Sequence, residues 1–160
     1  KLVNNTWTQI GQDIDGEAAY DYSGWSVSLS ADGKTVAVGA NYNDKKNYGQ
    51  NGNGFDSGHV RLYKLNRVYK NDKWIDKWTQ IGQDIDGEAS YDRSGNSVSL
   101  SADGKRVAIG APYNDGNGNS SGHVRIYELK TERKKLHEQP VLIGAAAIAI
   151  GLGAGIRIKD

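Results

Sequence analysis

The side chains that could do chemistry in this 160-residue sequence are carboxylates and histidines, and they occur in repeated sets. The repeated groups are Asp13, Asp15 and Glu17; Asp84, Asp86 and Glu88; and His59 and His123. Paired carboxylates can act as general acid and base, and histidine can transfer protons or bind a metal. The acidic sets are identical and lie in polar turns, however, and repetition of the histidines favours a packing or turn role. With no nucleophile elbow, zinc-protease helix or phosphate loop, the sequence predicts a protein that is not an enzyme.

One loop has oxygen-bearing side chains at a spacing that suits a metal ion. Its candidate ligands are Asn114, Asp115, Asn117 and Asn119. Calcium prefers carboxylate and amide oxygens, but the loop lacks the closing bidentate glutamate of the best-known calcium loops. Asn, Asp and Gly are also the residues of an ordinary turn. Calcium is therefore the one ion that the sequence leaves open, and no cofactor is required.

The composition excludes other classes of function. Twenty Lys and Arg residues nearly balance 19 Asp and Glu residues, so the charge gives no case for a nucleic-acid partner. The absence of Cys excludes disulfides and thiolate metal sites. The sequence has no Met, even at its first position, and we expect a chain that begins after processing or is a fragment.

An internal repeat organises the chain. Residues 7–44 align without a gap with residues 78–115, at an offset of 71, and only six of these 38 positions differ. The differing pairs are Ala19 and Ser90, Tyr22 and Arg93, Trp25 and Asn96, Thr35 and Arg106, Val38 and Ile109, and Asn41 and Pro112. The match resumes between residues 57–63 and 121–127. The sequence therefore contains one structural module twice.

Each module has the pattern of short β-strands. In the first module, apolar and polar residues alternate from 25 to 30, and an Asp-Gly turn separates this segment from a strand-like segment at 35–39. Further strands are expected at 59–65 and at 7–14. We predict an all-β protein of two four-stranded antiparallel sheets. The expected organisation is a first unit at 1–66, a linker at 67–77 that forms a surface connection held by aromatic contacts, a second unit at 78–130, a basic juxtamembrane linker at 131–140 and a transmembrane helix at 141–158.

The motif Ser-Gly-x-Ser-Val-Ser-Leu-Ser-Ala-Asp-Gly-Lys-x-Val-Ala-(Val/Ile)-Gly-Ala begins at Ser23 and again at Ser94. It resembles the FG-GAP repeats of integrin-α-type β-propellers, with Ser-Gly in place of Phe-Gly in both copies. The resemblance implies that each unit is a divergent propeller blade. It also implies a calcium loop between the two halves of the motif, but only a short Asp-Gly turn occupies that interval here, so this calcium site is not carried over.

Positions that differ between the copies are candidates for partner binding, since structural requirements should be the same in both. Tyr22 and Trp25 give the first unit an aromatic pair where the second unit has Arg93 and Asn96. The pair either contacts a partner or fills a gap at an end blade.

The C-terminal segment is apolar and rich in small residues. Residues 141–156 contain no charge and as a helix would extend about 24 Å, which flanking basic side chains could lengthen toward a bilayer core of about 30 Å. Small residues recur on one face of this helix, at Gly144, Ala147, Gly151 and Ala154, a pattern typical of helix packing in membranes. Alternation of Ile and Leu with small residues leaves a β-strand as the other interpretation.

Two blades cannot close a propeller ring, so their faces must be covered by a partner, by copies of the chain or by another region. We expect a non-enzymatic, single-span accessory subunit of a larger membrane protein complex, photosynthetic or respiratory, whose tail contacts the lipid bilayer and other membrane-protein subunits. The alternative is a membrane-tethered extracellular adhesion module. The family resemblance favours an extracellular or lumenal repeat domain, whereas the basic residues before the tail favour the opposite side.

Overall fold

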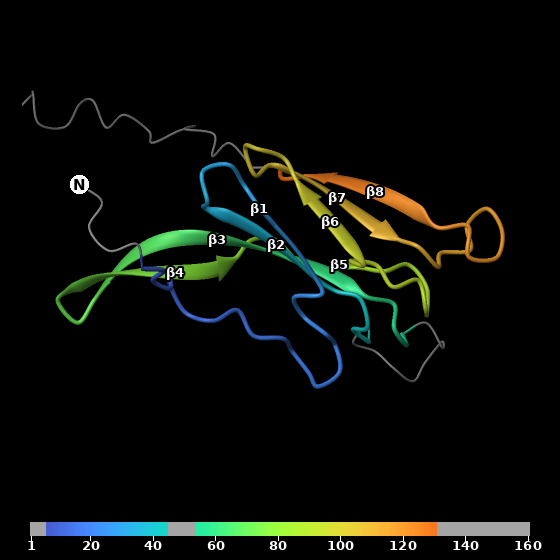
Figure 1. The fold of residues 1–160 in the computed structure, drawn as a ribbon, viewed down its shortest axis with the longest axis horizontal. Helices are drawn as coiled ribbons and strands as arrows, with labels where there is room; N and C mark the ends of the chain where they lie inside the picture. The colour runs from blue at the N-terminus through green and yellow to red at the C-terminus, as the bar shows by residue number, and fades with distance from the viewer. Residues whose placement is uncertain (1–5, 45–53, 131–160) are drawn as a thin grey trace, which may run out of the picture. The chain divides into compact units, whose positions relative to one another are not determined.

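The computed structural model describes residues 6–44 and 54–130. These residues form eight β-strands and no helix (Figure 1), so this part of the chain contains no helix that could cross a membrane. The predicted segments 131–140 and 141–158, with the small residues Gly144, Ala147, Gly151 and Ala154, lie outside the described residues.

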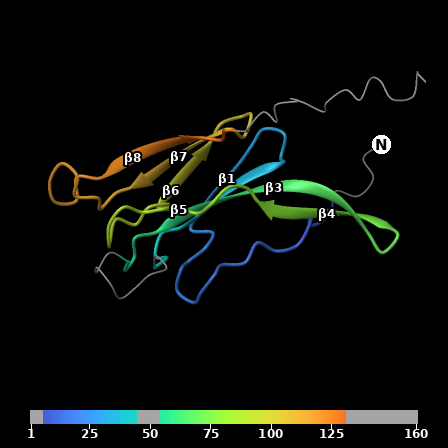
Figure 2. The same ribbon diagram turned by 180° about the vertical axis from the view of Figure 1, so that it is seen from behind.

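Two antiparallel sheets confirm the prediction of an all-β protein, although the strands divide unequally between them. The first sheet contains β1 (Ser26–Leu29), β2 (Thr35–Ala40), β3 (His59–Lys70) and β4 (Lys73–Gln80) in that order, and β5 (Ile85–Asp86) pairs with the start of β3. The second sheet, also visible from behind in Figure 2, contains β6 (Ser97–Leu100), β7 (Arg106–Ala111) and β8 (His123–Glu128) in that order.

The predicted Asp-Gly hairpin connects β1 to β2. Ser30 donates its hydroxyl proton to Asp32 at 2.6 Å, and Asp32 accepts the Lys34 amide at 3.0 Å. Gly33 has a φ of 67°, which explains why glycine follows the aspartate. These hydrogen bonds, that from Ser30 first, lower the pKa of Asp32. The second sheet repeats the turn between β6 and β7, as the identical sequence predicts.

The prediction of a strand at 7–14 is wrong, because the first sheet takes its outer strand from elsewhere. Residues 7–14 form no strand and Trp7 is fully exposed. β3 instead pairs with β4, in the register Leu65 opposite Trp78 and Tyr63 opposite Gln80. Trp78 is the counterpart of Trp7 in the second repeat. The first sheet is therefore completed by residues of the following repeat.

The segment expected as a linker at 67–77 forms a β-hairpin. β3 continues to Lys70, the chain reverses at Asn71 and Asp72, and β4 follows. Both turn residues have positive φ, 51° and 58°, as two-residue hairpin turns require. The rings of Tyr69 and Trp74 lie 5.2 Å apart across the hairpin, so the expected aromatic contact is present.

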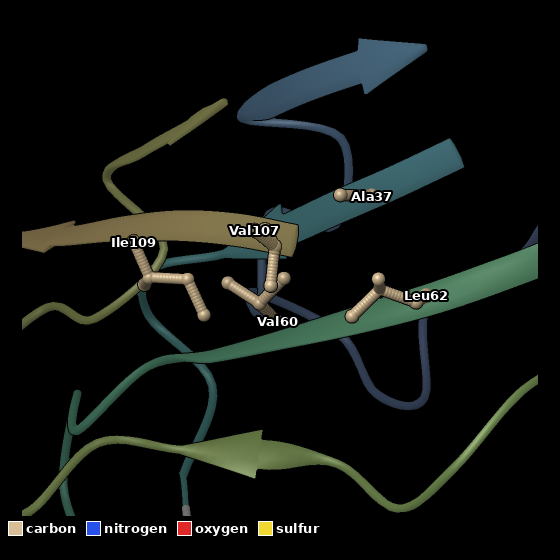
Figure 3. Packing of buried hydrophobic residues seen from close by; sticks show 5 residues of the cluster. All are labelled: Ala37, Val60, Leu62, Val107 and Ile109. Carbon is tan, nitrogen blue, oxygen red and sulfur yellow. The ribbon is translucent and has the colours of Figure 1, made fainter. Parts of the chain in front are cut away.

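A small core lies between the two sheets (Figure 3). The first sheet contributes Ala37, Val60 and Leu62, and the second contributes Val107 and Ile109, all at most 9% exposed. Partly buried side chains surround them, namely Ile81, Ile85, Val98, Leu100 and Tyr127. Because burial of one aliphatic side chain contributes about 1.5–3 kcal/mol, packing of the two sheets on each other stabilises both.

Because Asp72 has a positive φ, substitution at this position should change the stability of the β3–β4 turn. Asp72→Gly should raise the free energy of unfolding by about 1 kcal/mol because glycine adopts this conformation without steric cost, whereas Asp72→Ala should lower it. Urea unfolding measures both. A shift in the same direction for the two variants would contradict the turn geometry.

Candidate interaction surface

Each sheet has two faces, which we name by their residues. The front face of the first sheet carries Val27, Leu29, Val36 and Val38, which lie opposite one another in pairs on β1 and β2. The front face of the second sheet carries the equivalent Val98, Leu100, Val107 and Ile109. The back faces carry Ala37, Val60 and Leu62 in the first sheet and Ala108, Val124 and Ile126 in the second.

Among the described residues, only one front face and one back face are covered by the other sheet. The back face of the first sheet packs on the front face of the second, and this contact is the core. Val27 and Leu29 on the other front face are 64% and 57% exposed, and Val124 and Ile126 on the other back face are 67% and 72% exposed. Apolar side chains gathered in this way mark interaction surfaces. In the part of the chain that the structure describes, two faces of opposite kinds are therefore open, the front face along β1 only, because Val38 on β2 is 8% exposed.

The covered contact shows how two repeats recognise each other. The backbone of Ser57 accepts the Ser94 amide at 2.9 Å, and Gly58 accepts the Gly87 amide at 2.7 Å. Ser28 accepts the Leu100 amide through its hydroxyl at 2.9 Å. The sheets also approach so closely at Gly95 that an added Cβ would collide with the backbone carbonyl of His59. Backbone and short side chains thus define the junction.

A partly buried charge cluster links the two repeats beside β3. Arg61 donates to both carboxylate oxygens of Asp84, at 2.9 and 2.8 Å, and also contacts Glu17. Gln80 donates to Asp84 at 2.7 Å. The hydrogen bonds from Arg61 hold the pKa of Asp84 at about 2 instead of 3.8, and Asp84 in turn raises the pKa of Arg61. Since Asp84 belongs to the second repeat, this ion pair joins the repeats.

His59 lies in the same cluster and is nearly buried. Ligand atoms of Glu17, His59 and Asp84 lie within 4.8 Å of one another, which is close enough for a metal ion. The Arg61 guanidinium already contacts both carboxylates, however, so a protein cation occupies the position that a metal would neutralise. Burial, with Arg61 second, lowers the pKa of His59 below 6.5. The cluster is therefore suited to structural pairing.

The second repeat contains an equivalent but incomplete cluster. Arg125 on β8 donates to Glu88 at 3.0 Å and to the Asp86 carbonyl at 2.7 Å. Its Nε is buried and has no hydrogen-bond partner among the described residues, whereas Nε of Arg61 has Asp84. An unsatisfied buried donor costs about 1–3 kcal/mol. Neither arginine was predicted as a site residue from the sequence, although both recur inside the two His-Val-Arg motifs.

The predicted partner-binding residues are exposed and grouped. Tyr22 and Trp25 are 52% and 56% exposed, and both contact the ring of Tyr42, at 5.1 and 6.4 Å between ring centroids. Their counterparts in the second repeat lie at the junction between the sheets. Arg93 lies 4.3 Å from the centre of the Tyr42 ring, and Asn96 accepts a hydrogen bond from Asn41 at 3.1 Å.

The predicted calcium ligands use their oxygens within their own loop. Asn114 accepts the Gly116 amide at 2.9 Å and donates its side-chain amide to Asp92, and Asp115 accepts the Ser120 amide at 2.6 Å. Asn117 and Asn119 are exposed. This arrangement favours the interpretation as an ordinary turn, and calcium binding stays a prediction.

Two antiparallel sheets that stack through a small-residue junction and leave one face open at each end define a repeat protein of the propeller-blade class. The FG-GAP repeat family model matches residues 14–63 and 85–127, more than half of the chain. The chain therefore belongs to the FG-GAP repeat family. Comparison with curated proteins and with solved structures finds no match.

Removal of the Asp84 carboxylate should destabilise the fold. Asp84→Asn should lower the free energy of unfolding by about 1–3 kcal/mol, because Arg61 loses a charged hydrogen-bond partner. The control is Asp76→Asn, whose exposed ion pair with Arg67 should contribute less than about 1 kcal/mol. Because folding lowers the pKa of Asp84 from 3.8 to about 2, its contribution is complete above pH 4 and is lost as the pH falls through 2. An Asp84→Asn variant with unchanged stability above pH 4 would refute the role of the ion pair.

Mild acid should also destabilise the protein through His59. Folding lowers the pKa of His59 below its ordinary value of about 6.5. Between the pKa of the folded protein and pH 6.5, His59 therefore binds more protons in the unfolded chain. The free energy of unfolding consequently decreases as the pH falls below about 6.5. The decrease in melting temperature between pH 7 and pH 5 should be smaller in His59→Gln than in the native chain. His123→Gln is the matched control, and an equal effect of the two variants would contradict the assignment to His59.

Proposed function

We propose that this chain is a non-enzymatic scaffold protein that binds protein partners through the open front face of its first sheet and the open back face of its second. FG-GAP repeats are interaction modules, and the chain belongs to that family. The observation that supports the proposal most strongly is the exposure of Val27, Leu29, Val124 and Ile126, whose counterparts in the covered contact are partly or fully buried.

The proposed setting is a larger membrane protein complex in which the chain is a single-span accessory subunit. The support is the uncharged segment 141–156 with its small-residue spacing, preceded by the basic residues of 131–140. In this arrangement the tail packs among other membrane-protein subunits and the blades cover one face of the complex. A repeat domain on the extracellular or lumenal side agrees with the family.

Extraction in mild detergent, native gel separation and mass spectrometry of the comigrating proteins test this function. The native chain should migrate with a set of membrane proteins, and Leu29→Asp should lose them, because a charge on the front face opposes apolar contact. Lys70→Glu is the control, since Lys70 is exposed on the β3–β4 hairpin away from both faces. Migration of the native chain by itself would contradict the proposal.

The second candidate is a membrane-tethered adhesion module of the integrin-like kind, for which the exposed Tyr22–Trp25–Tyr42 aromatic group offers a contact surface. Calcium separates the two functions. If the loop at 114–119 is a turn, neither calcium nor a chelator should shift the melting temperature by more than about 1 °C, because binding would raise it through mass action. A calcium-dependent rise of several degrees that Asp115→Asn removes would favour the adhesion module.

A further inference from the structure

β8 is an edge strand of the second sheet. Its counterpart in the first sheet is β3, which pairs with β4 on the equivalent side (orange and green strands in Figure 1). No strand covers this edge among the described residues. We propose that residues 7–14 of a second copy of this chain pair with the edge of β8, so that copies join head to tail. The inference rests on the proposed function, since it names a partner for the two open faces.

The segment that covers β3 has a duplicate in the chain. Residues 78–88, which supply part of β4 and β5, are identical in sequence to residues 7–17. β3 and β8 are equivalent at an offset of 64 and share their His-Val-Arg motif. Transfer of the observed register, in which Lys64 is opposite Thr79 and Val60 is opposite Ile85, places Glu128 opposite Thr8 and Val124 opposite Ile14 of the second copy. The chain thus holds both an open edge and a segment that fits it.

Residues 7–14 form no strand, but they share local features with the docked segment at 78–85. Gln9 donates to Asp13 at 2.8 Å, as Gln80 donates to Asp84 at 2.7 Å. A positive φ recurs at the same place in both segments, 75° at Gly11 against 74° at its counterpart Gly82. These shared features reduce the conformational entropy that the segment loses when it docks.

The incomplete charge cluster points to the same partner. In the covered junction, Nε of Arg61 donates to Asp84, whereas Nε of Arg125 is buried without a partner among the described residues. The counterpart of Asp84 in the first repeat is Asp13. Docking of a second copy would bring its Asp13 to Arg125 in the geometry that Asp84 has with Arg61, and would satisfy this donor.

The two open faces are both apolar, one a front face and the other a back face, as in the covered contact. Packing of the second copy repeats the observed contact of a back face with a front face, now with Val124 and Ile126 of one copy against Val27 and Leu29 of the next. Ile10 and Ile14 of the first repeat line a groove together with Val27 and Leu29 of the front face. Ile81 and Ile85 of the second repeat line the corresponding groove together with Val107 of the second sheet, and Leu62 on β3 of the first sheet contributes to its lining. Ile126, the counterpart of Leu62, would contribute to the open groove.

At positions where the two repeats differ in sequence, the residues on both sides of the contact between repeats change together. Within the chain, Asn41 donates to Asn96. Between copies, the counterparts are Pro112 and Trp25, so an apolar pair replaces a polar pair. Likewise Arg93 packs on Tyr42, and the counterparts Tyr22 and Tyr113 would form an aromatic pair. The predicted partner-binding residues Tyr22 and Trp25 would therefore contact Tyr113 and Pro112 of the neighbouring copy.

A contact of this kind uses different surfaces on the two molecules, so it continues until a ring closes. Each copy adds two blades, and closed propellers contain four to eight. A closed assembly of this chain would therefore contain an even number of blades.

Cross-linking of the full chain in mild detergent tests the register, because the native sequence has no cysteine. Thr8→Cys and Glu128→Cys are placed in separate chains, mixed and oxidised. They should form a disulfide-linked dimer, since directly opposite residues in a sheet lie within disulfide range. A mixture of Gln9→Cys with Glu128→Cys is the control and should cross-link far less, because neighbouring residues on a strand point to opposite faces.

Sedimentation of the native chain over a range of concentrations provides the second measurement. The native chain should self-associate, and Asp13→Asn should weaken association by about 10- to 100-fold, as expected for loss of a charged hydrogen bond. Asp76→Asn should leave association unchanged. A native chain that stays monomeric, or equal cross-linking in the two mixtures, would overturn the proposal. Comigration with other proteins in the native gel would then still support the scaffold function.

Discussion

The pairing of β3 with residues of the following repeat is the constraint on which the rest of this structure depends. A strand edge must satisfy its backbone hydrogen bonds, and beside residues 59–65 of β3 the partners are the end of β4, Ile81 and β5, all from the second repeat. The same connection brings Asp84 to Arg61 and places the front face of the second sheet over Val60. Sheet completion, charge pairing and core packing therefore have one common origin.

Dependence on a following repeat also makes each repeat incomplete by itself. The first repeat is completed within the chain, whereas the second leaves β8, Arg125 and an apolar back face open in the described structure. These open groups are of three kinds: backbone, charged and apolar. All three would be satisfied by a neighbour that resembles the first residues of this chain. The architecture therefore favours association in series, which is consistent with a scaffold.

Much of the fold could be predicted from the sequence. Alternation in β1 and the Asp-Gly turn gave the correct hairpin, because these signals are local. Which of the two identical segments, 7–14 or 78–85, completes the first sheet could not be predicted from the sequence. Residues 78–80 and 85–86 form strands only because β3 lies next to them. The charge cluster was missed because Arg61 and Asp84 are 23 positions apart, and their meeting depends on this same pairing.

Residue-resolved amide hydrogen exchange tests the account most directly, because identical sequences remove most differences in intrinsic rate. The amide of Ile81 donates to Leu62 at 2.9 Å and should be protected at every protein concentration. The amide of its counterpart Ile10 should exchange quickly in dilute solution and become protected as concentration rises. Equal exchange of Ile10 and Ile81 in dilute solution would contradict the account.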